Sequence, residues 1–128
     1  MKSVLVVEDN IESMELVVCL LETKGYTSEV ANDGKQALEL VNKYLFDLII
    51  LDMQLPKVDG FEVLQRLKRT LNSNTPVVVV TACIIRENEK EFLEKNNIRY
   101  LLKPYKINQF YEATSFYLSN NVSASIRA

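Results

Sequence analysis

The sequence predicts a doubly wound α/β domain, in which helices cover both faces of a parallel sheet. Short β-branched runs recur five times along the 128 residues, and each is followed by a segment long enough for a helix. Parallel strands need crossover connections, and right-handed crossovers place helices on both sides of a sheet. A chain of this length is expected to form one domain with one core, without disulfides or a structural metal.

The five β-branched runs are the expected strands. They are Ser3–Val7, Ser28–Ala31, Leu48–Leu51, Val77–Val80 and Arg99–Leu102. The third and fourth runs are apolar throughout, which is typical of central strands that are buried on both faces. Ser28 and Glu29 make the second run partly polar, so it is expected at an edge of the sheet.

Turn residues and apolar stripes predict the first three helices. Asn10 is the expected N-cap of the first helix, and Gly25 is its expected end. Asp33-Gly34 and Asp59-Gly60 precede the second and third helices. Their apolar stripes are Met14, Val17, Val18 and Leu21, then Ala37, Leu38 and Val41, then Phe61, Leu64 and Leu67.

The last two helices differ in how much apolar surface they can bury. The fourth, around Glu87–Lys95, has mainly Phe92 and Leu93 for this purpose. We therefore expect it to be the most loosely held of the five. The fifth helix carries the stripe Phe110, Ala113, Thr114 and Tyr117.

Composition excludes several classes of protein. The chain has 15 Lys and Arg against 17 Asp and Glu, so no basic field attracts nucleic acid or anionic lipid. No apolar run approaches the roughly 18 residues of a membrane span, and Met1-Lys2 leads into the first strand without a signal peptide. Cys19 and Cys83 form no C-x-x-C pattern and are expected to be buried free thiols in the reducing cytoplasm.

Polar residues stand where the expected strands end. These residues are Glu8 and Asp9, Asp52, Thr81, and Lys103. Ligands of doubly wound sheets bind outside the carboxyl ends of the strands. An acid just after a strand is often the N-cap of the next helix. However, Asn10 already provides a cap after the first strand, and Asp59 explains the cap of the third helix better than Asp52 does.

The acids at these strand ends predict a site for a hard cation. Two carboxylates about 4 Å apart repel by roughly 4 kcal/mol at an effective dielectric constant near 20. The chain contains no histidine, so oxygen atoms are the natural ligands, and oxygen ligands favour Mg²⁺. With Mg²⁺ and the ammonium of Lys103 nearby, Asp52 could act as a nucleophile toward a phosphoryl group.

Four motifs at these strand ends resemble those of the receiver domain of two-component response regulators, the CheY-like family. They are VVEDN at 6–10, ILDMQLP at 50–56 with DG at 59–60, VTA at 80–82, and YLLKP at 100–104. The resemblance covers residues 1–120 and leaves 121–128 as a short polar tail. It implies a flavodoxin-like (βα)5 three-layer sandwich with strand order 2-1-3-4-5. It also implies a signalling domain whose own chemistry is limited to Mg²⁺-dependent self-phosphorylation and slow autodephosphorylation.

The resemblance assigns roles to the phosphoacceptor site. Asp52 would accept the phosphoryl group. The ligands of Mg²⁺ would be Glu8, Asp9, Asp52 and the backbone carbonyl of Gln54. Gln54 and Cys83 would flank the phosphoryl group and tune its lifetime.

The resemblance also implies a switch that reads the phosphoryl group. Thr81 would hydrogen-bond a phosphoryl oxygen, Lys103 would pair with it, and Tyr100 would turn inward when Thr81 moves. The Lys103–Pro104 peptide is expected to be cis. Where the family usually has Gly-Ala, this chain has Asn96-Asn97, and Asn96 is expected to adopt the left-handed conformation in place of the glycine.

The expected partners are proteins. A histidine kinase or a histidine phosphotransfer protein would donate the phosphoryl group, and a downstream protein would read the face formed by the fourth helix, the fifth strand and the fifth helix. That face could also form a homodimer. No direct contact with DNA or a membrane is expected.

Three other classes share parts of this pattern. A flavodoxin-type cofactor site is disfavoured because Glu8 and Asp9 would repel a phosphate. An aspartate-nucleophile phosphatase would carry a second acid where this chain has Gln54. The main alternative is a receiver-like scaffold that binds proteins without being phosphorylated, which would not require the acids, Thr81 and Lys103 together.

Overall fold

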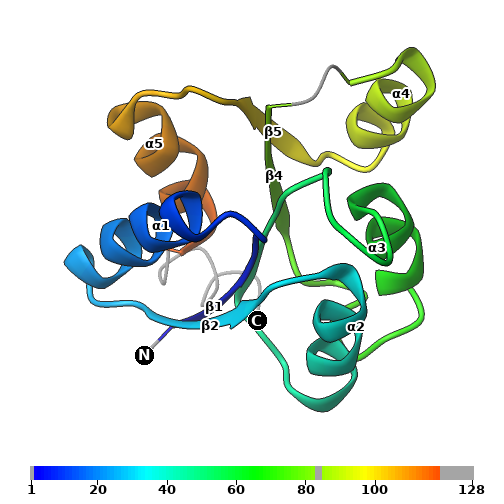
Figure 1. Cartoon of the computed structure of the whole chain (residues 1–128), viewed down its shortest axis with the longest axis horizontal. Coiled ribbons are helices and arrows are strands. Elements are labelled where there is room, and N and C mark those ends of the chain that lie inside the picture. Colours follow the sequence, from blue (N-terminus) through cyan, green and yellow to red (C-terminus); the bar gives the residue numbers. More distant parts are fainter. Residues whose placement is uncertain (1, 83–84, 119–128) are drawn as a thin grey trace, which may run out of the picture.

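Five parallel strands form one sheet in the order β2-β1-β3-β4-β5, and five helices surround it (Figure 1). The computed structural model describes residues 2–82 and 85–118. The elements are β1 (Ser3–Val7), α1 (Ile11–Thr23), β2 (Thr27–Ala31), α2 (Gly34–Lys43), β3 (Leu48–Leu51), α3 (Gly60–Leu67), β4 (Val77–Thr81), α4 (Glu87–Lys95), β5 (Arg99–Leu102) and α5 (Ile107–Leu118). The expected fold class and strand order are confirmed. The tail expected at 121–128 lies outside the described residues.

The sheet is the middle of three layers. In Figure 1, α1 and α5 lie on one side of the strands, and α2, α3 and α4 lie on the other. Ile50 belongs to the core that includes Leu21 of α1 and Phe110 of α5, whereas its neighbour Ile49 belongs to the core that includes Val63 of α3. Successive residues of β3 thus face opposite cores, which explains its unbroken apolar run.

The register of the strands brings their carboxyl ends together. Val7 of β1 lies opposite Ala31 of β2 and Leu51 of β3. Thr81, the last residue of β4, lies opposite Leu102 of β5. The residues that follow β1, β3 and β5 therefore lie on the same side of the domain, at the carboxyl ends of the strands.

Side-chain caps begin the first three helices at the expected residues. The side chain of Asn10 accepts a hydrogen bond from the backbone N–H of Ser13 at 2.9 Å. Asp33 and Asp59 cap α2 and α3 in the same way, with donor–acceptor distances of 2.8 and 3.0 Å. These bonds satisfy N–H groups that a helix leaves unpaired at its start. Asp59 is thus a cap, and the carboxylate of Asp52 is left for the site.

Two expectations about single residues are wrong. Cys19 is exposed, because two positions along a helix correspond to a rotation of about 200° and the buried Val17 holds the opposite side of α1 against the sheet. Asn97 (φ +56°) adopts the left-handed conformation, whereas Asn96 (φ −99°) caps the end of α4. The chain therefore reverses one residue later than the motif suggested. Cys83 lies outside the described residues.

The described helices contain no segment that is both long and apolar enough to cross a membrane. The longest, α1, has 13 residues.

Candidate functional site

Three carboxylates gather where β1 and β3 end. Glu8 and Asp9 follow β1, and Asp52 follows β3. One carboxylate oxygen of each residue lies within 4.8 Å of those of the other two. Glu8 and Asp52 are buried, and Asp9 is exposed. Together these three residues form the acid cluster. It lines an open cleft of about 930 Å³.

The backbone around Asp52 is held by close packing. The N–H of Asp52 donates to the carbonyl of Val7 at 3.0 Å, which extends the pairing of β1 and β3 by one residue. The N–H of Gly60 donates to the carbonyl of Met53 at 3.0 Å. A Cβ at Gly60 would lie 2.5 Å from the carbonyl oxygen of Asp52, so only glycine fits at this approach.

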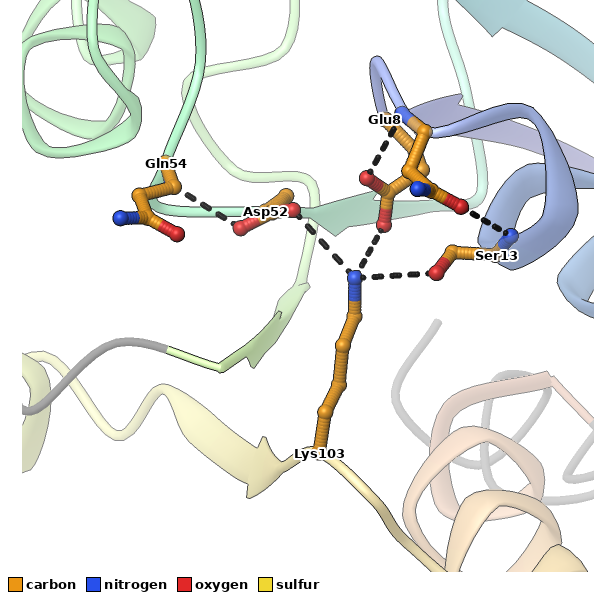
Figure 2. A network of polar contacts seen from close by, with 6 residues as sticks. Glu8, Ser13, Asp52, Gln54 and Lys103 are labelled. Carbon is orange, nitrogen blue, oxygen red and sulfur yellow. Dashed lines mark hydrogen bonds and ion pairs between the residues drawn. The ribbon is translucent and has the colours of Figure 1, made fainter.

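Lys103 reaches the acid cluster from the end of β5. Its Nζ lies 2.7 Å from Oε1 of Glu8, 3.3 Å from Oγ of Ser13 and 3.4 Å from Oδ2 of Asp52 (Figure 2). The other oxygen of Asp52, Oδ1, accepts a hydrogen bond from the N–H of Gln54 at 2.9 Å. The ammonium is therefore bound more closely by Glu8 than by Asp52.

Burial and charge shift the acid–base properties of this group. Burial raises the pKa of Glu8, although its hydrogen bond from Lys103 opposes the change. Burial alone would lower the pKa of Lys103, but the hydrogen bond to Glu8 and the charges of Asp52 and Glu8 outweigh it and raise that pKa. Lys103 therefore stays charged, and its single positive charge is paired with two of the three carboxylates, Glu8 and Asp52.

The donor set of the acid cluster fits Mg²⁺. The residues offer carboxylate oxygens and the nearby backbone, without imidazole or thiolate ligands among the described residues, and hard divalent cations prefer such oxygens. A divalent cation would also balance the excess negative charge, because two buried carboxylates share one ammonium.

The predicted switch residues lie on β4 and β5. Thr81 is fully buried at the end of β4, and its carbonyl accepts a hydrogen bond from the N–H of Lys103 at 2.9 Å. The Lys103–Pro104 peptide is cis. Tyr100 is half-buried and packs against the core under α3 and α4.

Of the two residues expected to tune the lifetime of the phosphoryl group, one is described. The side chain of Gln54 is exposed at the rim of the cleft, and Figure 2 shows it beside Asp52. Cys83 lies outside the described residues, so its predicted role rests on the sequence alone.

Ser13 belongs to this network although nothing in the sequence singled it out. It stands in the first turn of α1, and its hydroxyl faces Lys103, which is 90 residues away along the chain. The sequence offered one signal for this contact: Ser13 lies three residues after the predicted N-cap Asn10, so it belongs to the helical turn next to the end of β1.

Comparisons with known proteins agree with this fold. A family model described as the response regulator receiver domain matches residues 4–115. The polar-differentiation response regulator DivK of Brucella anthropi is 36% identical over 120 residues, which span 93% of this chain and 98% of that protein. The chemotaxis protein CheY4 of Vibrio cholerae has a TM-score of 0.80 at 28% identity, covering 91% of this chain and 98% of that one. The receiver domain of Francisella response regulator 1452 has a TM-score of 0.79 at 32% identity, covering 94% and 100%.

Proposed function

This chain belongs to the response regulator receiver domain family, and on that premise we propose that Asp52 accepts a phosphoryl group in a Mg²⁺-dependent reaction. Receiver domains are signalling domains and not classical enzymes. The observation that carries the proposal is the placement of the Asp52 carboxylate, which is buried at the end of β3, close to Glu8 and Asp9 and 3.4 Å from the ammonium of Lys103.

The reaction would be a transfer from a phosphohistidine of a histidine kinase or phosphotransfer protein. A carboxylate oxygen of Asp52 forms a bond to phosphorus while the bond from phosphorus to the imidazole nitrogen breaks, and the imidazole leaves. The chain has no histidine and cannot be its own donor. The open cleft over Asp52 leaves room for a partner side chain to approach.

Residues around Asp52 would share the charge of the transferred group. Mg²⁺ would be held by Glu8, Asp9, Asp52 and the backbone carbonyl of Gln54, and when bound it would neutralise charge on the phosphoryl oxygens. The ammonium of Lys103, 3.4 Å from Asp52, would pair with one phosphoryl oxygen. The hydroxyl of Thr81 would hydrogen-bond another. Slow loss of the phosphoryl group to water, tuned by Gln54 and Cys83, would reset the domain.

The phosphoryl group would change the face formed by α4, β5 and α5. In support of this, α4 buries Leu93 alone among its nine residues, and both ends of β5 are exposed. Movement of Thr81 toward the phosphoryl group would let Tyr100 turn inward and shift these elements between two states. A downstream protein, or a second copy of the domain, would read this change.

The test of phosphorylation uses acetyl phosphate, Mg²⁺ and intact-protein mass spectrometry. We expect the wild-type chain to gain one phosphoryl group, and to lose this gain when EDTA removes the metal. Asp52→Asn should gain none. Asp59→Asn is the matched control, because it removes a nearby exposed carboxylate and keeps a residue that caps α3. A gain that persists in Asp52→Asn would place the phosphoryl group on another residue and overturn the role of Asp52. No gain in the wild-type chain would overturn the proposal in favour of a scaffold that is not phosphorylated.

The test of the switch uses beryllofluoride, which mimics the phosphoryl group, and NMR chemical shifts. We expect shifts in residues 85–102 that exceed those in β2 and α2. If residues 85–102 keep their shifts while Asp52 binds the mimic, the proposed output face is wrong.

A further inference from the structure

We infer that Ser13 is a positioning residue for Lys103. Its hydroxyl anchors the ammonium in the site, at a point that neither the metal nor the phosphoryl group needs to occupy. The inference deepens the proposed function and rests on it for its role in phosphoryl transfer, but the contact on which it depends can be measured without phosphorylation.

The ammonium of Lys103 has three protons and three acceptors. The acceptors are Oε1 of Glu8 at 2.7 Å, Oγ of Ser13 at 3.3 Å and Oδ2 of Asp52 at 3.4 Å (Figure 2). Side-chain exposure at this site is low, 20% for Lys103 and 5% for Glu8, so water competes little for these protons. Each acceptor therefore contributes to where the ammonium rests.

Two of the three acceptors have a second task in the proposed reaction. Glu8 would hold the metal, and Asp52 would carry the phosphoryl group. Each of these events changes the charge that the acceptor presents to Lys103. The hydroxyl of Ser13 is neutral and has no other side-chain partner among the described residues. It is the acceptor that stays the same through the reaction.

The backbone fixes Ser13 in relation to the acid cluster. The N–H of Ser13 donates to the side chain of Asn10 at 2.9 Å, and the N–H of Asn10 donates to Oε2 of Glu8 at 3.2 Å. The connection from β1 to α1 therefore presents the carboxylate of Glu8 and the hydroxyl of Ser13 as one unit. Lys103 bridges this unit to β3 through Asp52.

The chemistry at this position favours a hydroxyl. A carboxylate would add a fourth negative charge to the acid cluster and would hold the ammonium away from Asp52. An apolar side chain would leave one proton of a half-buried ammonium without a protein acceptor. A serine supplies an acceptor without charge.

The test compares Ser13→Ala with Ser13→Thr, which keeps the hydroxyl. The first readout is hydrogen exchange of the Lys103 ammonium, followed by ¹H–¹⁵N NMR in EDTA and assigned by loss of its signal in Lys103→Met. We expect exchange to be about tenfold faster in Ser13→Ala and near the wild-type rate in Ser13→Thr. Alanine favours helix formation, so Ser13→Ala should stay folded.

The second readout is the rate of phosphorylation by acetyl phosphate, measured beside the affinity for Mg²⁺. In Ser13→Ala we expect the rate to fall about fivefold to tenfold while the Mg²⁺ dissociation constant changes less than twofold, because Ser13 is not a proposed ligand. Thr23→Ala is the matched control, since it removes a hydroxyl from the exposed far end of the same helix.

The two proposals fail in different ways. Unchanged ammonium exchange in Ser13→Ala would overturn the anchoring by Ser13 and leave phosphorylation of Asp52 untouched. Absence of phosphorylation in the wild-type chain would overturn the proposed function, and the exchange measurement in EDTA would still decide whether Ser13 holds Lys103. An equal fall in rate for Thr23→Ala would show a general effect of α1 and would overturn the specific role.

Discussion

The two strands on either side of β4, β3 and β5, differ in how deeply their residues are buried. All four residues of β3 are buried, whereas β5 has two exposed and two half-buried residues. The helices that follow β3 and β4 differ in the same way. The buried residues of α3 are Gly60, Val63, Leu64 and Leu67, and that of α4 is Leu93.

The comparison shows how one small domain can combine a fixed site with a responsive face. Asp52 stands at the end of the well-anchored β3, but Lys103 approaches it from the weakly anchored β5. Local stability follows buried apolar contacts, so the side of the domain around α4 and β5 should open at a lower free energy than the side around β3. A change of charge on Asp52 would therefore act through Lys103 on β5, the strand whose surroundings have the fewest buried apolar contacts.

The largest expected effect comes from disturbing the well-anchored side. In Gly60→Ala the new Cβ would lie 2.5 Å from backbone atoms of Asp52 and Met53, which cannot move without shifting the site. We expect the free energy of unfolding to fall by about 3 kcal/mol, measured by urea denaturation. Gly25→Ala is the control. It has an unfavourable φ of +83° but no neighbour within 4 Å, so its loss should be about 1 kcal/mol. Equal losses would contradict the close packing at Gly60.

The next effect tests the weakly anchored side. Leu93→Ala removes the buried contact of α4 and should lower the free energy of unfolding by about 2 kcal/mol, at the low end for a buried leucine because the helix can relax. Native-state hydrogen exchange should show the loss first in amides of α4 and β5. Leu64→Ala on α3 should instead speed exchange across the whole sheet. If both variants lower protection uniformly, the two sides are not separate units.

A smaller, pH-dependent effect tests the link between the two sides. Burial raises the pKa of Glu8 above its ordinary value of 4.5, so the carboxyl is protonated more readily in the folded state. The stability that comes from this proton is fully present below pH 4.5 and is lost as pH rises through the raised pKa of the folded state.

Lys103→Met should widen this loss, because the ammonium opposes the rise in the pKa of Glu8. In EDTA we expect the variant to be less stable than wild type by about 1 kcal/mol at neutral pH. The difference should shrink toward pH 4.5, the ordinary pKa of the carboxyl, as measured by urea denaturation across the pH range. A difference that is constant with pH would mean that Lys103 acts through packing and not through charge.

The smallest expected effect comes from two residues with a left-handed backbone conformation, one near β3 and one near β5. Lys57 (φ +69°) lies in the loop after Asp52, and Asn97 (φ +56°) lies between α4 and β5. Lys57→Gly relieves an unfavourable backbone but loses the ion pair of the exposed Lys57 with Asp33 at 3.3 Å. We expect a net gain of about 0.5 kcal/mol in thermal or urea unfolding. Asn97→Gly should change stability by less, because asparagine tolerates this conformation. A larger gain for Asn97→Gly would mean that the backbone is more strained at Asn97 than at Lys57.

The strands were predictable because burial acts on short runs of sequence. Three of them match the predicted bounds, and β2 and β4 are each longer by one residue, Thr27 and Thr81. A threonine next to a predicted strand does not reveal whether it pairs with a neighbouring strand, since that depends on where the neighbour begins and ends. Thr81 belongs to β4 because Leu102 of β5 lies opposite it.

Helix faces were less predictable at their edges. Leu20 and Leu118 are buried although neither belonged to an expected apolar stripe, whereas Cys19 is exposed. The period of a helix places residues on faces but does not say how wide the covered face is. That width is decided by the sheet and the neighbouring helix, which lie far away in the sequence.

By itself the sequence determined which residues stand at the carboxyl ends of the strands, because hydrophobic runs and turn residues act locally. This was enough to nominate Glu8, Asp52 and Lys103. The tertiary structure alone decided that the ammonium lies 2.7 Å from Glu8 but 3.4 Å from Asp52, and that Ser13 completes its three contacts. The physical reason is distance along the chain. These contacts join residues 95, 51 and 90 positions apart, and their lengths depend on how strands and helices pack once the sheet has formed.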